Sequence, residues 1–305
     1  MKLALKLIGI VIFIVILLTA VDFSRLLTTL QTVRPDLALL SLLLFFPLMI
    51  VQAFRWWLVC RQLKIEVGFT ALLEIYYISW FLGSIPMSGA TPFSKTLYLK
   101  TEGFAWDRSA AVVVIDKVLD LLGTMGFALF GLSYLPHQYL VDFLSGWIYV
   151  AGGGMVLFIL FQTRLMKKAW DRIWTFFVRR LGDKAPDVAS ILTDFRQGIG
   201  VRTGFAHLLL IVAIGLMRSV ILYVLALSLS LNVSFWLMVA CRSLIGAINI
   251  VPISINGLGT RDAVLLLILP LWGITKEAAV ALAFLAFIWA VFTKLSGVLF
   301  WLKRH

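Results

Sequence analysis

The sequence predicts an all-α, polytopic membrane helical bundle with about six full spans and two broken helix pairs. Of its 305 residues, 62% are hydrophobic and only 14% are charged, whereas soluble domains carry about a quarter charged residues. Apolar runs near 20 residues, the length that crosses a bilayer, recur along the chain. Two further apolar regions are too long for one span and are interrupted by Pro and Gly. We expect a single transmembrane domain over residues 1–305.

Six runs have the length of a full span. They lie at about Leu3–Val21, Leu37–Val59, Ser109–Leu135, Trp147–Phe161, Gly204–Leu231 and Ala278–Trp301. In the first, Lys2 and Lys6 precede an apolar stretch, as they would in a signal peptide. However, Leu18 stands where a cleavage site needs a small residue, so we expect a retained anchor.

The distribution of basic residues predicts the orientation of the chain. With the amino terminus inside, 19 of the 27 Lys and Arg residues fall in cytoplasmic segments and four fall outside. This asymmetry places both termini in the cytoplasm, with the protein in the cell membrane. It also explains the formal charge of +12, so no nucleic-acid partner is predicted.

The two interrupted regions are residues 67–106 and 233–275. Each is read as a re-entrant helix pair, because the spans on either side of it must keep their sidedness. The first pair would then enter from the cytoplasm and the second from outside. Two such breaks from opposite faces are typical of the inverted repeats of transporters.

Two decapeptides mark the breaks, Pro86–Lys95 (PMSGATPFSK) and Pro252–Arg261 (PISINGLGTR). Aligned without a gap, they share the first Pro, the third-position Ser, a hydroxyl at the ninth place and a base at the tenth. In each, a helix is expected to begin inside the membrane, at Thr91 and at Gly259, and helix amino termini attract anions. The candidate substrate-binding residues are Lys95, Arg261, Ser88, Thr91, Ser94, Ser254, Asn256, Gly257, Gly259 and Thr260.

Lys95 and Arg261 need negative partners. A base in the first turn of a helix is repelled by roughly 0.3–1 kcal/mol, and a charge at membrane depth costs about 2.5–3.5 kcal/mol. The partner is either a protein carboxylate or an anionic ligand, for which phosphate fits a basic, amide-lined site. The carboxylates available are Glu74, Asp116, Asp120 and Asp262.

The run Asp116-Lys117-x-x-Asp120 places two carboxylates on one helix face. Two compatible interpretations stay open: ion pairs with Lys95, Arg218 or Arg261, and a proton relay or head-group contact. The predicted coupling and ion-pair residues are Asp116, Lys117, Asp120, Asp262, Glu74, Arg218 and Arg242. Lys294 is a weaker candidate that can snorkel to the interface.

A polar segment at residues 162–203 contains two amphipathic runs with basic residues opposite apolar ones. Such helices lie on anionic lipid, or pack on their own protein as a connector. No G-x-S-x-G, H-E-x-x-H or metal-ligand spacing occurs, and Cys60 and Cys241 fall at opposite ends of the topology. No catalytic residue, metal, cofactor or disulfide is therefore predicted, although Asp-based chemistry stays open.

These motifs resemble the transmembrane region of lysylphosphatidylglycerol synthases and the stand-alone, flippase-like proteins grouped with it, over residues 35–300. The resemblance rests on Pro86–Lys95, Asp116–Asp120 and Pro252–Asp262. Lys95, Lys117, Asp116 and Asp262 depart from the commoner Arg and Glu, and Gly89 stands alone where Gly-Gly is frequent. The chain ends at His305, without room for a soluble aminoacyl-transferase domain. The resemblance implies a translocator-like module without lysyl transfer, and it does not specify the substrate.

Three functional hypotheses follow. The first is a flippase or transporter of an anionic, phosphate-bearing lipid, either a phospholipid or an isoprenoid-linked phosphate, with Lys95 and Arg261 on the phosphate and alternating access around them. The second is a non-catalytic partner of a lipid-modifying enzyme, docking through residues 162–203. The third is an intramembrane lipid transferase.

Overall fold

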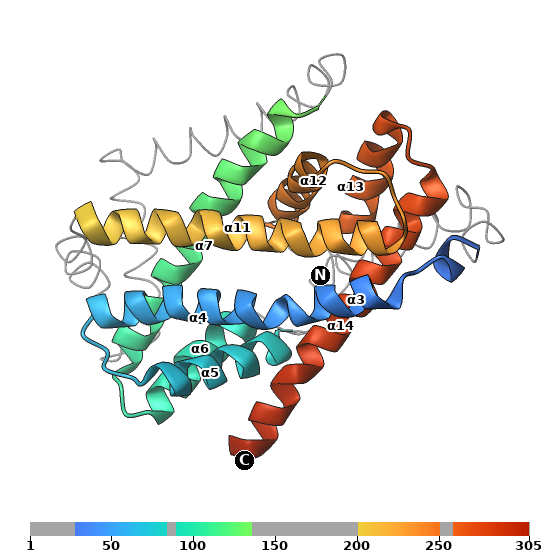
Figure 1. The fold of residues 1–305 in the computed structure, drawn as a ribbon. Helices are drawn as coiled ribbons and strands as arrows, with labels where there is room; N and C mark the ends of the chain where they lie inside the picture. The colour runs from blue at the N-terminus through green and yellow to red at the C-terminus, as the bar shows by residue number, and fades with distance from the viewer. Residues whose placement is uncertain (1–27, 84–89, 136–200, 251–258, 305) are drawn as a thin grey trace, which may run out of the picture.

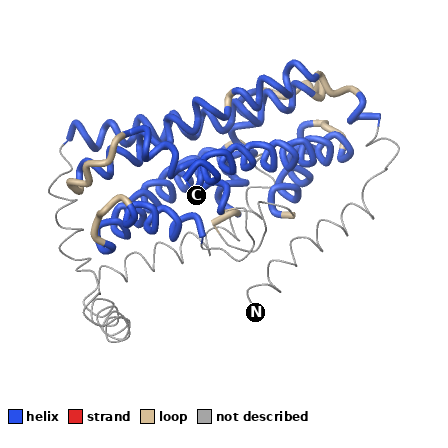
Figure 2. Tube along the Cα trace, turned by 90° about the horizontal axis from the view of Figure 1, so that it is seen from below, coloured by secondary structure: helices blue, strands red, loops and turns tan. Residues whose placement is uncertain are grey.

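A computed structural model describes residues 28–83, 90–135, 201–250 and 259–304. Throughout this part of the chain the regular structure is helical and no strand occurs, as Figures 1 and 2 show. In lipid a helix satisfies every backbone hydrogen bond within itself. The all-α membrane bundle predicted from the sequence is thus confirmed.

Three described helical stretches are long and apolar enough to cross a membrane: Pro35–Gln62, Thr203–Ser228 and Lys276–Arg304. The first consists of α3 (Pro35–Leu43) and α4 (Phe45–Gln62), the second lies in α11 (Val201–Ser228), and the third is α14 (Lys276–Arg304). α7 (Trp106–Ser133) is as long as α11 but carries three charged residues in its middle. The expected spans Leu3–Val21 and Trp147–Phe161 lie outside the described residues, as does segment 162–200.

The interrupted regions form short helices instead of spans. The first contains α5 (Phe69–Leu82) and α6 (Ala90–Thr101), and the second contains α12 (Phe235–Ile248), α13 (Thr260–Ile268) and the 3-10 turn η2 (Leu269–Trp272). Fourteen residues at 1.5 Å each give about 21 Å, less than the ~30 Å hydrocarbon core. The breaks themselves, residues 84–89 and 251–258, lie outside the described residues.

The two short pairs lie at opposite ends of the bundle (Figure 1). α5 packs on α4 with α6 beside it, whereas α12 packs on α11 with α13 beside it. Each end has its own hydrophobic core, one built mainly from α4, α5 and α7, the other from α11, α12 and α14. Trp289 of α14 packs against both cores and so joins them.

Glycines allow the closest helix contacts. A Cβ at Gly131 of α7 would collide with the Ser243 hydroxyl of α12, and a Cβ at Gly297 of α14 would collide with the Tyr77 carbonyl oxygen of α5. The backbones meet directly at these points. α7 packs against α6 and α12, and α14 packs against α5 and α13. Each long helix therefore contacts one member of each short pair.

Candidate functional site

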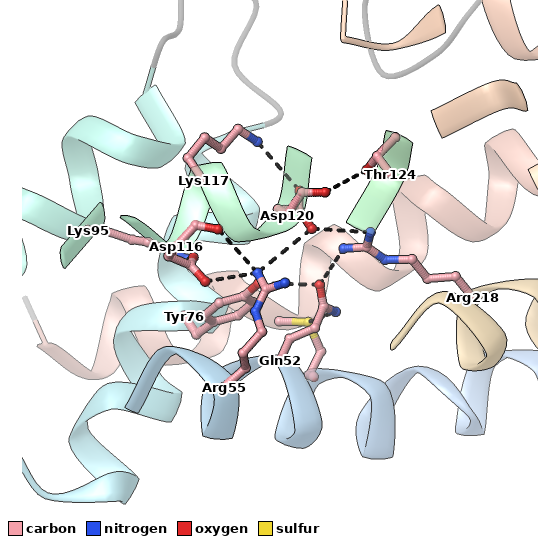
Figure 3. Close-up of polar contacts among 10 residues, drawn as sticks. Gln52, Arg55, Tyr76, Lys95, Asp116, Lys117, Asp120, Thr124 and Arg218 are labelled. Carbon is pink, nitrogen blue, oxygen red and sulfur yellow. Dashed lines mark hydrogen bonds and ion pairs between the residues drawn. The ribbon is translucent and has the colours of Figure 1, made fainter. Parts of the chain in front are cut away.

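The centre of the site is the carboxylate of Asp116 on α7 (Figure 3). One oxygen accepts from Arg55 Nη2 of α4 at 2.8 Å, and the other lies 3.0 Å from Lys95 Nζ of α6. All three side chains are less than 10% exposed. Breaking a buried pair leaves a costly unpaired charge, so this triad connects three helices firmly.

Asp120 lies one helical turn further along α7 and is less tightly held. Its oxygens lie 3.5 Å from Arg218, 3.8 Å from Arg55 and 3.8 Å from Lys117, and its side chain is 27% exposed. Arg218 donates a shorter hydrogen bond, 2.6 Å, to the side-chain oxygen of Gln52. Cations therefore surround Asp120, but none of them makes a short ion pair with it (Figure 3).

Two aromatic rings enclose the ammonium of Lys95. Its Nζ lies 3.9 Å from the ring centroid of Tyr76 and 4.7 Å from that of Trp56. Aromatic faces attract cations, more strongly where water is excluded. The base of the first break is thus stabilised by one carboxylate and two rings.

Arg261, the base of the second break, is neutralised by its own neighbour. Its Nε and Nη2 lie 3.2 and 3.1 Å from Oδ1 of Asp262. Oδ2 of Asp262 accepts from the backbone N–H of Gly259 at 2.7 Å. Gly259 has a φ of +85°, a conformation that glycine adopts without strain, and this turn starts α13. Thr260 donates to Asn249, across the break, at 2.8 Å.

Next to these groups lies a cavity of about 490 Å³, here called the basic cavity. Its described lining contains no carboxylate and five cations: Lys117, Arg218, Arg242, Arg261 and Lys294. A smaller cavity of about 110 Å³, the Asp116 cavity, contains Lys95 and shares Gln52, Trp80, Lys117 and Arg218 with the basic cavity. The bases of the two breaks therefore line adjoining cavities.

Positive charge is in excess around these cavities. A third, narrow one of about 60 Å³, the neck, adds no new charged residue. In total seven cations line the three cavities, against Asp116, Asp120 and the neighbouring Asp262, an excess of four positive charges. Of these cations Arg55, Lys95 and Arg261 are buried, and within the described ranges such an excess of positive charge favours an anionic ligand.

Unused hydrogen-bond donors occur in the same place. Arg242 lines the basic cavity and has no ion pair or side-chain hydrogen bond to any described residue. The buried Nε1 of Trp80 and Nε of Arg55 also lack partners among the residues described. Buried donors are normally satisfied, so these three groups could serve a ligand's oxygens.

The other predicted residues are distributed as follows. Glu74 pairs with Lys303 at 2.9 Å and Arg304 at 3.6 Å, at the end of α14, and not with Lys95 or Arg261. Ser94 and Thr260 are buried beside the two bases. Thr91 lies in the first turn of α6, and its side chain is outside the description. Ser88, Ser254, Asn256 and Gly257 lie outside the described residues.

Sequence reasoning missed Arg55, Gln52, Tyr76 and Trp80. It counted Arg55 among the cytoplasmic cations, whereas the structure places it 3% exposed at the centre of the network. One signal was available: Gln52 and Arg55 are two polar residues three apart in an apolar run, which places them on one helix face.

The amino-acid sequence can be compared with those of known families. The profile of the family described as the lysylphosphatidylglycerol synthase TM region matches residues 5–297. The chain belongs to this family. The family links the chain to membrane-embedded, lipid-related proteins, in agreement with the apolar helices. No match is found among curated proteins.

The His, Cys, Asp and Glu residues of the described segments are predicted from the sequence to form no metal site. No group of three His, Cys, Asp or Glu residues there could hold a metal ion. Cys60 and Cys241 are both buried and free. The described polar groups are arranged to bind charge, and the family's connection to lipids defines the class of molecule to consider.

Proposed function

We propose that the protein is a membrane lipid flippase that moves an anionic, phosphate-bearing lipid, a phospholipid or an isoprenoid-linked phosphate, through the basic cavity. The observation that carries this proposal is a cavity of ligand size whose described lining contains five cations and no carboxylate. Arg pairs with phosphate through two parallel hydrogen bonds. Arg218, Arg242 and Arg261 would supply such contacts from three different helices.

The pairing around Asp116 offers a route for exchange. Because Arg55 and Lys95 hold different oxygens of this carboxylate, Lys95 can turn to a phosphate while Arg55 still neutralises Asp116. Arg218 is similarly held to Asp120 by only a long contact of 3.5 Å. A phosphate entering the cavities would thus replace carboxylates as the partner of Lys95 and Arg218 without leaving an unpaired buried acid.

Alternating access would come from movement of one short pair relative to the other. The pairs lie at opposite ends of the bundle and belong to separate cores. This arrangement supports the re-entrant, inverted-repeat topology proposed from the sequence. The orientation with both chain termini in the cytoplasm stays a prediction from the distribution of basic residues.

Reconstitution in liposomes tests the proposal. Purified protein is inserted into vesicles with a fluorescent phosphatidylglycerol or a polyprenyl phosphate, and translocation is measured. Arg242→Gln and Arg261→Gln each remove one charged contact, worth about 1.5–3 kcal/mol, so translocation should fall about tenfold or more. Arg34→Gln, an exposed cation paired only with Asp36 among the described residues, is the matched control.

The other outcomes identify other functions. The description of the family as part of a synthase favours, as the second candidate, a non-catalytic partner of a lipid-modifying enzyme. That function predicts vesicles that stay inert until the enzyme is added. Chemical turnover of the labelled lipid would instead show a transferase. Translocation that is equal in wild type and in both cavity variants would contradict the assignment of the site.

A further inference from the structure

An apolar groove of about 620 Å³ lies between α7 and α11. Its walls include Leu122 and Gly126 of α7, Leu208 and Val212 of α11, and Trp236 of α12. Leu122, Leu208 and Trp236 are each more than half exposed. The groove is thus open outward, on helices whose exposed face is hydrocarbon-like.

The groove adjoins the neck, and the neck adjoins the basic cavity. It shares Gly123, Phe127 and Ile211 with the neck, and the neck shares Arg218 and Arg242 with the basic cavity. The apolar groove and the cationic cavity therefore each share wall residues with the neck, at the point where α7 and α11 pack closely at Gly123 and Gly215. From the groove to the basic cavity, the lining changes from apolar side chains to arginines. An anionic lipid has the matching order, a hydrocarbon tail followed by a phosphate.

The single ionisable group in the described groove lining does not disturb its apolar character. Nε2 of His207 lies 3.0 Å from the side-chain amide of Gln62 on α4, and the His207 side chain is buried. A cavity of several hundred Å³ with apolar walls is typical of ligand sites, which lie in the range of about 300–1,000 Å³.

We infer that the groove holds a hydrocarbon chain of the same anionic lipid whose phosphate lies in the basic cavity, so that the lipid enters sideways between α7 and α11. This inference rests on the proposed function. The residues that the neck shares with both the groove and the basic cavity select a lipid tail as the occupant, because a lipid carries a hydrocarbon chain and a phosphate in one molecule.

A glycine in the groove wall, Gly126, provides the test of this inference. A Cβ added at Gly126 meets no described atom within 4 Å, so a larger side chain there projects into open space. Gly126→Phe should fill the groove without displacing α11. Met125→Phe is the matched control, because Met125 is the adjacent residue, is 46% exposed and does not line the groove.

Three measurements are made on the full chain: translocation of dioleoylphosphatidylglycerol in liposomes, binding of glycerol 3-phosphate in detergent, and thermal stability. Gly126→Phe should slow translocation by about tenfold or more relative to Met125→Phe, the effect expected when a hydrocarbon pocket is filled. It should leave glycerol 3-phosphate binding and stability unchanged. The same assay with a polyprenyl phosphate shows which lipid is affected.

The outcomes separate this inference from the proposed function. Equal translocation by Gly126→Phe and Met125→Phe, with an active wild type, overturns the tail groove alone. Lower stability of Gly126→Phe than of Met125→Phe shows that another segment of the chain fills the groove, and this also overturns it. A wild type that neither moves lipid nor binds glycerol 3-phosphate overturns both.

Discussion

The two short helix pairs carry a buried base at the same place, yet they neutralise it differently. Lys95 of α6 reaches the carboxylate of Asp116 on α7 and shares it with Arg55 of α4. Arg261 of α13 is paired with Asp262, the next residue in its own helix. Both solutions satisfy a charge inside the bundle, but only the first connects different helices.

The two ways of neutralising the base have different consequences for the movement of the helix that carries it. Moving α6 away from α7 would separate buried charges, which is costly. α13 carries its counter-ion with it, and its described contacts with α14 are apolar side chains. Neutralisation over a distance ties α6 to α7, whereas local neutralisation gives α13 no ion pair to another described helix. If one short helix moves during transport, we expect it to be α13.

The strongest test of this contrast is Asp116→Asn. The substitution preserves shape but leaves two buried cations, Arg55 and Lys95, without their shared carboxylate. Breaking a buried ion pair costs about 3–5 kcal/mol, so the free energy of unfolding should fall by that amount. Denaturation in mixed micelles measures it, with Asp36→Asn, an exposed carboxylate, as control. A loss as small as that of the control would show that the triad does not anchor α6.

Asp262→Asn should have a smaller effect. It leaves only Arg261 unpaired, next to a cavity large enough for water, and the Asn side-chain oxygen can still accept from the N–H of Gly259. We expect a loss of about 1.5–3 kcal/mol, the value of one charge-assisted hydrogen bond, in the same micelle assay. A loss as large as that of Asp116→Asn would remove the distinction between the two pairs.

The smallest effect is expected for Glu74→Gln. Glu74 joins α5 to the end of α14 through Lys303 and Arg304, but Lys303 is 71% exposed. Solvent-accessible pairs contribute about 0–1 kcal/mol, and salt screens them. The melting temperature should therefore change little and should respond weakly to ionic strength. A drop comparable with Asp116→Asn would place the anchor at this end of the bundle instead.

The fold was largely predictable because length and hydropathy determine where a membrane helix begins and ends. The run expected at Leu37–Val59 is helical over Pro35–Gln62, and the run expected at Gly204–Leu231 lies at Val201–Ser228. The two interrupted regions also form short helices where the sequence predicts them. Family membership, inferred from three short motifs, is confirmed.

The connections within the site were only partly predictable. Sequence spacing places Asp116 and Asp120 on one face, and ion pairs with Lys95 and Arg218 were among the alternatives considered. It cannot show that Arg55 joins them, because that contact depends on how α4 packs against α7 across 61 residues. Arg242 illustrates the reverse case. A charge in an apolar run marks the residue from sequence, but only the fold shows that it lines a cavity rich in cations.

The close contact at Gly297 lies between two helices that line the basic cavity, α5 and α14. This residue lets the backbone of α14 touch that of α5 at Tyr77. Trp80 of α5 and Trp289 of α14 both line the basic cavity. Gly297 thus fixes how closely α5 and α14 approach each other beside the basic cavity. Under the proposed function, a residue outside the cavity lining would therefore affect the room available to a head group.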